Sequence, residues 1–112
     1  MIYDLRSYAT APGRLPEYLE LHEKHAFPLL RKHLGEPLGY WVTASGEINK
    51  FVHMWRFEGL GDMEQRHASL LADQAYLDYR ADVLGKMEML QRQENVLLRP
   101  LDLDAMRKRA AK

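Results

Sequence analysis

The chain of 112 residues contains no cysteine. Disulfides, thiolate nucleophiles and thiolate metal sites are therefore excluded, and side-chain packing has to hold the fold together. An excess of charge of either sign is also missing, because 16 lysines and arginines balance 16 aspartates and glutamates. A dedicated nucleic-acid binder needs a basic excess on one face. We therefore expect no nucleic acid among the partners.

Long hydrophobic runs are absent as well. No apolar stretch approaches the roughly 20 residues that cross a bilayer, so we predict no membrane span. The opening residues 1–6 lack the charged-then-apolar pattern of a signal peptide, which favours a cytoplasmic protein. No serine lies in a nucleophile-elbow motif, and the scattered glycines form no phosphate-binding loop. The length fits one domain with one core.

Alternating segments rich in strand formers are separated by segments with helical spacing. We predict strands over 2–9, 38–45, 50–57 and 87–99, although the last range also suits a helix. The first helix is predicted over 15–33, with a kink or break near 26–27 because Pro28 lies inside it. A second helix is expected to end near Ala72 and to restart at Asp73, packing with residues such as Leu84 until Gly85 ends it. Residues 1–100 then form the domain, and 101–112 form a frayed tail or a short surface helix.

This order, β-α-β-β-α-β, is typical of an α+β, ferredoxin-like fold with an antiparallel sheet. Two helices cover only one face of such a sheet. The other face still carries large apolar side chains and needs a cover. A homodimer that stacks sheet on sheet supplies that cover, so we expect a homodimer.

The run from Gly46 to Phe57 carries the leading candidate for chemistry. Phe51, His53, Trp55 and Phe57 alternate along it and share one strand face. An imidazole among large rings is either part of a packed core or the floor of a pocket. In the functional interpretation His53 is the catalytic base or hydrogen-bond donor, and the ligand is small and apolar or aromatic. The ligand-binding residues would be Trp55, Phe57, Tyr18, His22, Asn49 and Arg66. In the structural interpretation His53 is a hydrogen-bonded core residue.

Two further groups of polar residues need an interpretation. His22 and His25 lie three residues apart on the first helix, close enough in principle to share a metal. No HExxH-like spacing or third convergent ligand accompanies them, so we expect no metal. Asp4 and Arg6 alternate with Tyr8 on one strand face. They are expected to pair across strands or across a dimer seam, or Arg6 clamps a carboxylate ligand.

Five segments resemble the NIPSNAP family. They are the opening MIYDLRSY, PGRLPEYL from Pro12, GEINKFVHMWRF from Gly46, MEQRHASL from Met63 and ENVLLRP from Glu94. Met63 stands where the family pattern has an arginine. Together the segments cover residues 1–100, nearly the whole chain.

The resemblance implies a dimeric α+β barrel, related in fold to small cofactor-independent monooxygenases and haem-degrading enzymes. It implies no particular reaction, because the activity of the family is poorly defined. We therefore predict a protein that binds a small apolar or aromatic molecule beside His53, with no cofactor for any transformation. The alternative is a non-catalytic homodimeric interaction module. A third interpretation, from fold analogy alone, is haem held by a histidine of the first helix.

Overall fold

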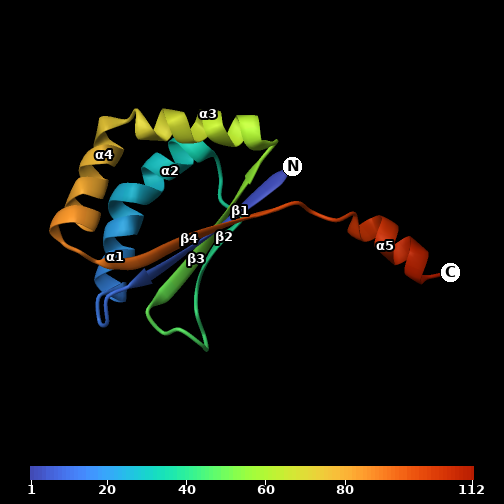
Figure 1. Cartoon of the computed structure of the whole chain (residues 1–112), viewed down its shortest axis with the longest axis horizontal. Coiled ribbons are helices and arrows are strands. Elements are labelled where there is room, and N and C mark those ends of the chain that lie inside the picture. Colours follow the sequence, from blue (N-terminus) through green and yellow to red (C-terminus); the bar gives the residue numbers. More distant parts are fainter.

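Four strands form one antiparallel sheet in the order β2-β3-β1-β4 in the computed structural model of the chain (Figure 1). The structure describes the backbone of residues 1–112 and every side chain except those of residues 84 and 86, so the expected packing of Leu84 lies outside the described side chains. The strands are β1 (Ile2–Thr10), β2 (Gly39–Val42), β3 (Lys50–Phe57) and β4 (Leu90–Leu98). The ferredoxin-like α+β prediction is confirmed.

Two strands are shorter than predicted. β2 ends at Val42 instead of residue 45, where the Thr43 hydroxyl donates to the Glu47 carbonyl and starts the connection to β3. β4 begins at Leu90 instead of residue 87. The amide of Met87 bonds to the carbonyl of Asp82, and Glu88 has a positive φ of 49°, so the chain turns there before it can join the sheet.

The first helical segment runs without a break through α1 (Leu15–Leu21), η1 (His22–Ala26) and α2 (Phe27–Leu34). Of the kink or break expected near 26–27, the break does not occur. Instead η1 is a π-helical turn, in which the amide of Phe27 bonds to the carbonyl of His22. This turn shifts the hydrogen-bonding register just before Pro28, so the proline lies at the start of α2, where a missing N–H costs little.

The second helical segment consists of α3 (Leu60–Leu71), α4 (Gln74–Arg80) and η2 (Ala81–Lys86). The restart predicted at Asp73 is confirmed, because its carboxylate caps α4 by accepting from the amide of Ala75 at 3.1 Å. The helix continues past Gly85, where we expected it to end. Among the described helices, none combines the length and apolar character that crossing a membrane requires.

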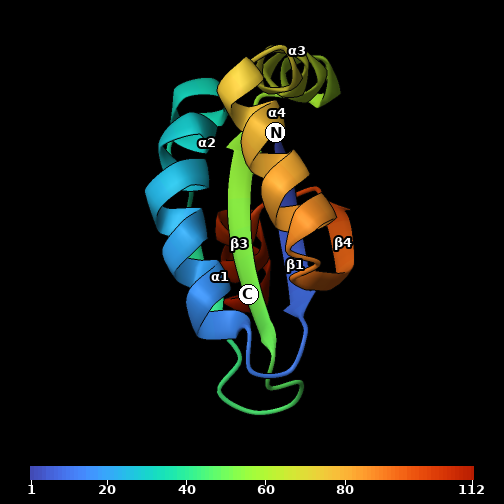
Figure 2. The ribbon, with the colours of Figure 1, turned by 90° about the vertical axis from the view of Figure 1, so that its left-hand side faces the viewer.

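All of these helices lie on one side of the sheet (Figure 2). The core fills the space between the two layers, with rings and aliphatic side chains that β3 contributes together with the helices. Its buried members form two clusters, one of Ala26, Leu30, Leu34, Trp55, Phe57 and Leu70, and one of Tyr8, Tyr18, Phe51, Val83 and Met89.

The opposite sheet face has no helix over it and carries exposed apolar side chains. Trp41, Val96 and Leu98 are each between 41% and 48% exposed. The Trp41 ring folds back over Gly39, where an added Cβ would lie only 2.6 Å from the ring, so a larger residue there would displace the ring. We call this surface the open face.

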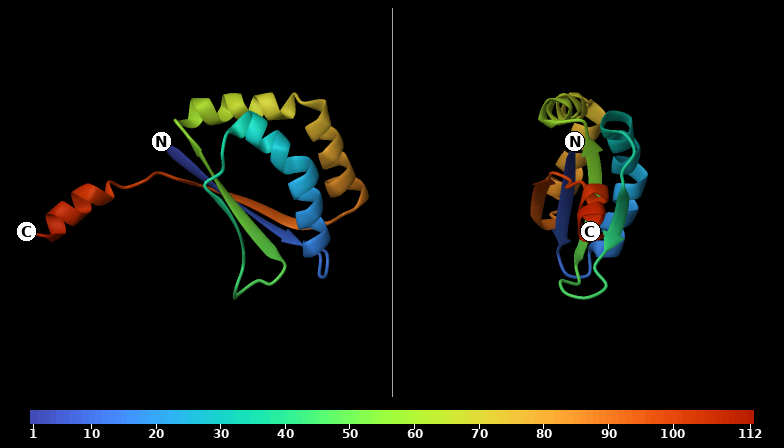
Figure 3. Two further views of the ribbon diagram at one scale, coloured as in Figure 1. Left: turned by 180° about the vertical axis from the view of Figure 1, so that it is seen from behind. Right: turned by 90° about the vertical axis from the view of Figure 1, so that its right-hand side faces the viewer.

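The C-terminal residues form α5 (Leu103–Ala110), which extends away from the domain (Figure 3). The tail is therefore a surface helix, one of the two alternatives expected from the sequence. All of its residues except Ala105 are exposed. Because it buries almost nothing, α5 contributes little to the core.

Candidate functional site

His53 lies at the centre of a stack of aromatic rings on the helix-facing side of the sheet. Its side chain is 0% exposed. The ring is parallel to that of Tyr40, 4.6 Å away at 7°, and to that of Tyr8, 5.1 Å away at 5°. Strand register produces this stack, because Tyr40 on β2 pairs directly with His53 and Tyr8 on β1 pairs with the neighbouring Phe51.

The imidazole of His53 is neutral and has one free hydrogen-bonding atom. The indole N–H of Trp55 donates to His53 Nδ1 at 2.5 Å, whereas Nε2 has no hydrogen-bond partner among the described residues. Burial, followed by the proximity of His22 and Arg6, lowers the pKa of His53 to about 2. With Nδ1 accepting, the proton of the neutral ring resides on Nε2. His53 is therefore placed to donate a hydrogen bond and is a weak base.

The side chain of His22 on η1 packs against the same stack. Its Nε2 lies 2.9 Å from the hydroxyl of Tyr40, and its ring centroid lies 5.5 Å from that of His53. Burial lowers the pKa of His22 to about 4 and raises that of Tyr40 above its usual range. Both groups are thus neutral near pH 7. His22 Nδ1 has no hydrogen-bond partner among the described residues.

Two cavities lie on either side of His22. The first, which we call the apolar pocket, has a volume of about 470 Å³ and lies between the first helical segment and the β2 edge of the sheet. Its walls are mainly hydrophobic and aromatic, with Glu23 at the helix side: Leu19, His22, Phe27, Tyr40, Trp41, Val42 and Phe51.

The second, which we call the arginine cavity, has a volume of about 170 Å³ and lies between the helices and the β1–β4 half of the sheet. It is more polar. Its walls include Arg6, Tyr8, Tyr18, His22, Tyr79 and Arg80. His22 is common to both cavities and separates them.

The structure brings together only some of the residues predicted to bind a ligand. Tyr18 and His22 line the arginine cavity, and His22 also lines the apolar pocket. His53, Trp55 and Phe57 line neither of these two cavities, and the last two belong to the core cluster around Leu34.

Asn49 and Arg66 lie away from this group. The carbonyl of Asn49 accepts from the amide of Thr10 at 2.7 Å, at the end of the sheet. The guanidinium of Arg66 pairs with Asp62 at 2.9 Å on the surface of α3. Neither residue is among those that line the two cavities.

Sequence reasoning gave no role to Tyr40 or Tyr8, although both belong to the His53 stack. Strand alternation gives the face of β1 on which Tyr8 lies and the face of β2 on which Tyr40 lies. It does not show which residue of β3 lies beside either ring. The register depends on pairing between β1, β2 and β3, which no local pattern supplied.

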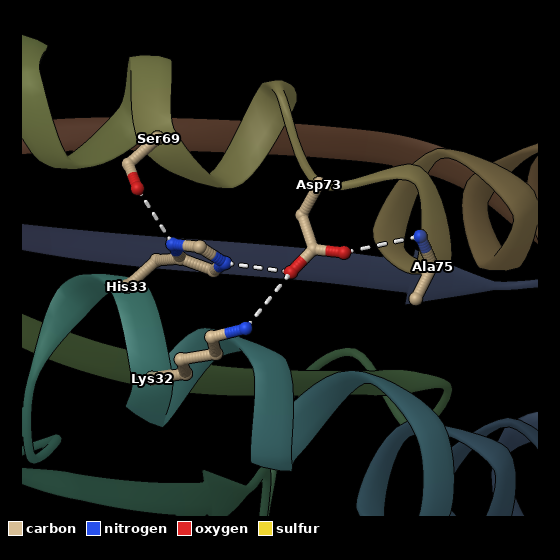
Figure 4. Close-up of polar contacts among 5 residues, drawn as sticks. All are labelled: Lys32, His33, Ser69, Asp73 and Ala75. Carbon is tan, nitrogen blue, oxygen red and sulfur yellow. Dashed lines mark hydrogen bonds and ion pairs between the residues drawn. The ribbon is translucent and has the colours of Figure 1, made fainter.

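A second polar group joins three helices and was also missed (Figure 4). His33 on α2 lies 2.7 Å from the Ser69 hydroxyl of α3 and 2.8 Å from the Asp73 carboxylate at the start of α4. Lys32 Nζ lies 3.7 Å from the same carboxylate. These residue types also occur in hydrolytic triads, but neither described cavity touches them. Their arrangement is that of a helix-joining network.

The sequence model of the NIPSNAP family matches residues 3–103. This chain belongs to the NIPSNAP family. The human protein NipSnap homolog 3A is 27% identical over 96 residues, which are 85% of this chain and 37% of that protein. The chain therefore spans little more than a third of the length of this curated relative.

Solved NIPSNAP structures agree with the fold. A structure from Agrobacterium tumefaciens is 33% identical, with a TM-score of 0.83 over 90% of this chain and 94% of that one. A NIPSNAP-like domain protein from Burkholderia xenovorans, described as uncharacterized, is 31% identical, with a TM-score of 0.83 over 90% and 85% of the two chains. A putative antibiotic biosynthesis monooxygenase from Nitrosomonas europaea is 13% identical, with a TM-score of 0.63 over 91% of this chain and 100% of that one, and shares the fold alone.

Proposed function

We propose that this NIPSNAP-family chain binds a small apolar or aromatic molecule in the apolar pocket. The observation that carries the proposal is the pocket itself, with its volume of about 470 Å³ and its aromatic walls. Binding sites for small molecules typically have volumes of roughly 300–1,000 Å³ and mostly apolar walls with a few polar groups. In this pocket the polar groups include His22, the hydroxyl of Tyr40 and, at the helix side, the Glu23 carboxylate.

His53 has an indirect role in this proposal. Its ring stacks on Tyr40 from the core side, and its pKa of about 2 makes it a poor proton acceptor. We therefore assign to His53 the positioning of Tyr40. A ligand that displaces the rings of Tyr8 and Tyr40 would accept a hydrogen bond from the Nε2–H of His53. Of the two roles expected from the sequence, base or hydrogen-bond donor, the proposal keeps the donor role and adds the positioning of Tyr40.

Titration with indole, followed by calorimetry and by NMR shifts, tests the proposal. Val42→Trp fills the pocket from an exposed position on the edge strand β2, where we expect the fold to tolerate it. We expect this variant to weaken indole binding by at least about tenfold, equal to about 1.4 kcal/mol. Ile48→Trp is the matched control, because Ile48 is exposed in the β2–β3 connection and lines neither cavity. Equal binding by both variants, or no shift for residues 19, 22, 40 and 51, would contradict the proposal.

A second candidate function is that of a homodimeric interaction module, favoured by the open face. Its exposed apolar side chains, including Trp41 and Val96, form a sheet surface without a cover. Stacking two copies face to face would bury both surfaces.

Light scattering on the purified chain tests this candidate. Val96 lies on the open face of the edge strand β4. A carboxylate buried in a stacked apolar interface is strongly unfavourable, so Val96→Glu is expected to convert a dimer into a monomer. Ile48→Glu provides the control, since Ile48 is also exposed but lies in a loop. A monomer for the unaltered chain, or a dimer for Val96→Glu, argues against the module.

A further inference from the structure

The function proposed for the apolar pocket gives no role to the arginine cavity. Its volume of about 170 Å³ is close to that of an engineered cavity of roughly 150 Å³ that holds benzene. A single aromatic ring with one small substituent therefore fits. The exposed side chains of Leu71 and Gln93 are part of its border, so the cavity reaches the surface near β4.

The charges around the cavity favour an anion. Arg6 and Arg80 both line it, and the lining residues include no carboxylate. Arg6 Nε is buried and has no hydrogen-bond partner among the described residues. A buried guanidinium group with a free donor is costly unless a partner satisfies it.

Asp4 neutralises only part of this charge. Its carboxylate lies 3.5 Å from Arg6 Nε, but it also accepts from the Asn95 side chain at 3.3 Å and lies 3.8 Å from His67 Nε2. Arg80 has no such neighbour among the ion pairs of the described residues, and its guanidinium lies 5.8 Å from the centre of the Tyr76 ring. The two arginines together therefore exceed the one nearby carboxylate.

The rest of the wall is aromatic and neutral. Rings of Tyr8, Tyr18, Tyr76 and Tyr79 line the cavity. Burial raises the pKa of the Tyr79 hydroxyl to about 12 and that of Tyr18 further still, so both keep their protons at neutral pH. Protonated hydroxyls donate hydrogen bonds to a carboxylate.

We propose that the arginine cavity binds a small aromatic carboxylate the size of benzoate. The Arg6 guanidinium pairs with the carboxylate, and the tyrosine rings flank the aromatic ring. A charge-assisted pair with arginine is about twice as strong as a neutral hydrogen bond, so the charge of the ligand decides its affinity. This site is independent of the apolar pocket, although His22 borders both.

Calorimetric titration of the full chain with benzoate and with benzyl alcohol tests the proposal. Benzyl alcohol has the same ring and a neutral polar group. We expect benzoate to bind at least about tenfold more tightly, and Arg6→Gln to remove that advantage while benzyl alcohol binding is unchanged. Arg14→Gln is the control, because Arg14 is a surface arginine paired with Glu17 and lies outside the cavity.

A second variant serves in case Arg6→Gln fails to fold. Gln93→Glu preserves size at an exposed position of the edge strand β4 and places a negative charge at the cavity border. It is expected to weaken benzoate binding by at least about tenfold through like-charge repulsion and to spare benzyl alcohol.

Three results would overturn the proposal. The first is equal affinity for benzoate and benzyl alcohol, and the second is benzoate binding that Gln93→Glu leaves unchanged. The third is no binding of either probe, which would mean that ordered water alone satisfies Arg6 Nε. Val42→Trp distinguishes this site from the proposed function. That variant fills the apolar pocket, so it should weaken indole binding by at least about tenfold and leave benzoate binding intact.

Discussion

His33 Nε2 lies 2.8 Å from Asp73 Oδ2 and joins the end of α2 to the start of α4. The same carboxylate caps α4 through the amide of Ala75, so one side chain satisfies a helix terminus and holds two helices together. The hydrogen bond from His33, with that from the Ala75 amide, lowers the pKa of Asp73 despite the opposing effect of desolvation. Asp73 therefore stabilises the fold in its charged form.

Replacing Asp73 with alanine should lower the melting temperature by about 5 °C, as the loss of one helix cap does in a domain of this size. Differential scanning calorimetry measures the change. Asp102→Ala is a matched control, because Asp102 caps α5 in the same way, accepting from Ala105 at 2.9 Å, on a helix outside the core. Asp102→Ala should leave the melting temperature nearly unchanged, because α5 is exposed. A fall in Asp73→Ala no larger than in Asp102→Ala would show that Asp73 does not stabilise the domain.

Acidification should destabilise the domain through its two buried histidines. The pKa values of His22 and His53 fall from 6.5 to about 4 and about 2 in the folded state, chiefly because of burial. Between 6.5 and these values the unfolded chain binds protons that the folded chain does not, so stability falls as the pH falls through this window. From about pH 7.5 to pH 5.5 we expect a loss of about 3 kcal/mol, half from each histidine.

Urea denaturation at a series of pH values measures this loss. His53→Gln removes one titrating group and keeps an acceptor for the Trp55 indole, so it should halve the pH dependence. His25→Gln is the control, because His25 is exposed, and its pH dependence should match that of the unaltered chain. If the unfolding free energy of His53→Gln falls with pH as steeply as that of the unaltered chain, His53 does not remain neutral on acidification.

Gly35 is required at the end of α2. Its φ of 90° and ψ of −164° lie in a region that only glycine occupies without strain. Gly35→Ala is therefore expected to destabilise the domain by about 1–3 kcal/mol, measured by urea denaturation. Gly59→Ala is the control, because its φ of −179° is extended and an added Cβ would meet nothing within 4 Å. A similar loss in both variants would point to a general cost of removing glycine.

Removal of residues 101–112 should leave the domain as stable as before. The helix α5 is almost wholly exposed, so its removal changes the melting temperature by less than about 2 °C. Calorimetry and light scattering on the shortened chain check this prediction. A large drop in melting temperature, or a change in oligomeric state, would mean that α5 packs on the domain of another copy.

Much of the fold follows from local patterns. Alternation along residues 2–9 and 50–57 predicted β1 and β3 to within a residue, because one face of each strand must be buried. Asp73 marked the restart of a helix, because a carboxylate that accepts from the first amides stabilises a helix terminus. The ends of β2 and β4 were wrong, since turns at Thr43 and Glu88 depend on hydrogen bonds that no local pattern reveals.

The sequence by itself determined that His53 shares a strand face with Phe51 and Trp55, because alternation is a property of one strand. It also determined the family, through segments spread over most of the chain. Only the tertiary structure decided that Tyr8 and Tyr40 enclose His53, that His22 divides two cavities, and that Arg6 borders one of them. These relationships join residues from different elements, and their distances depend on strand register and on how the helices pack over the sheet.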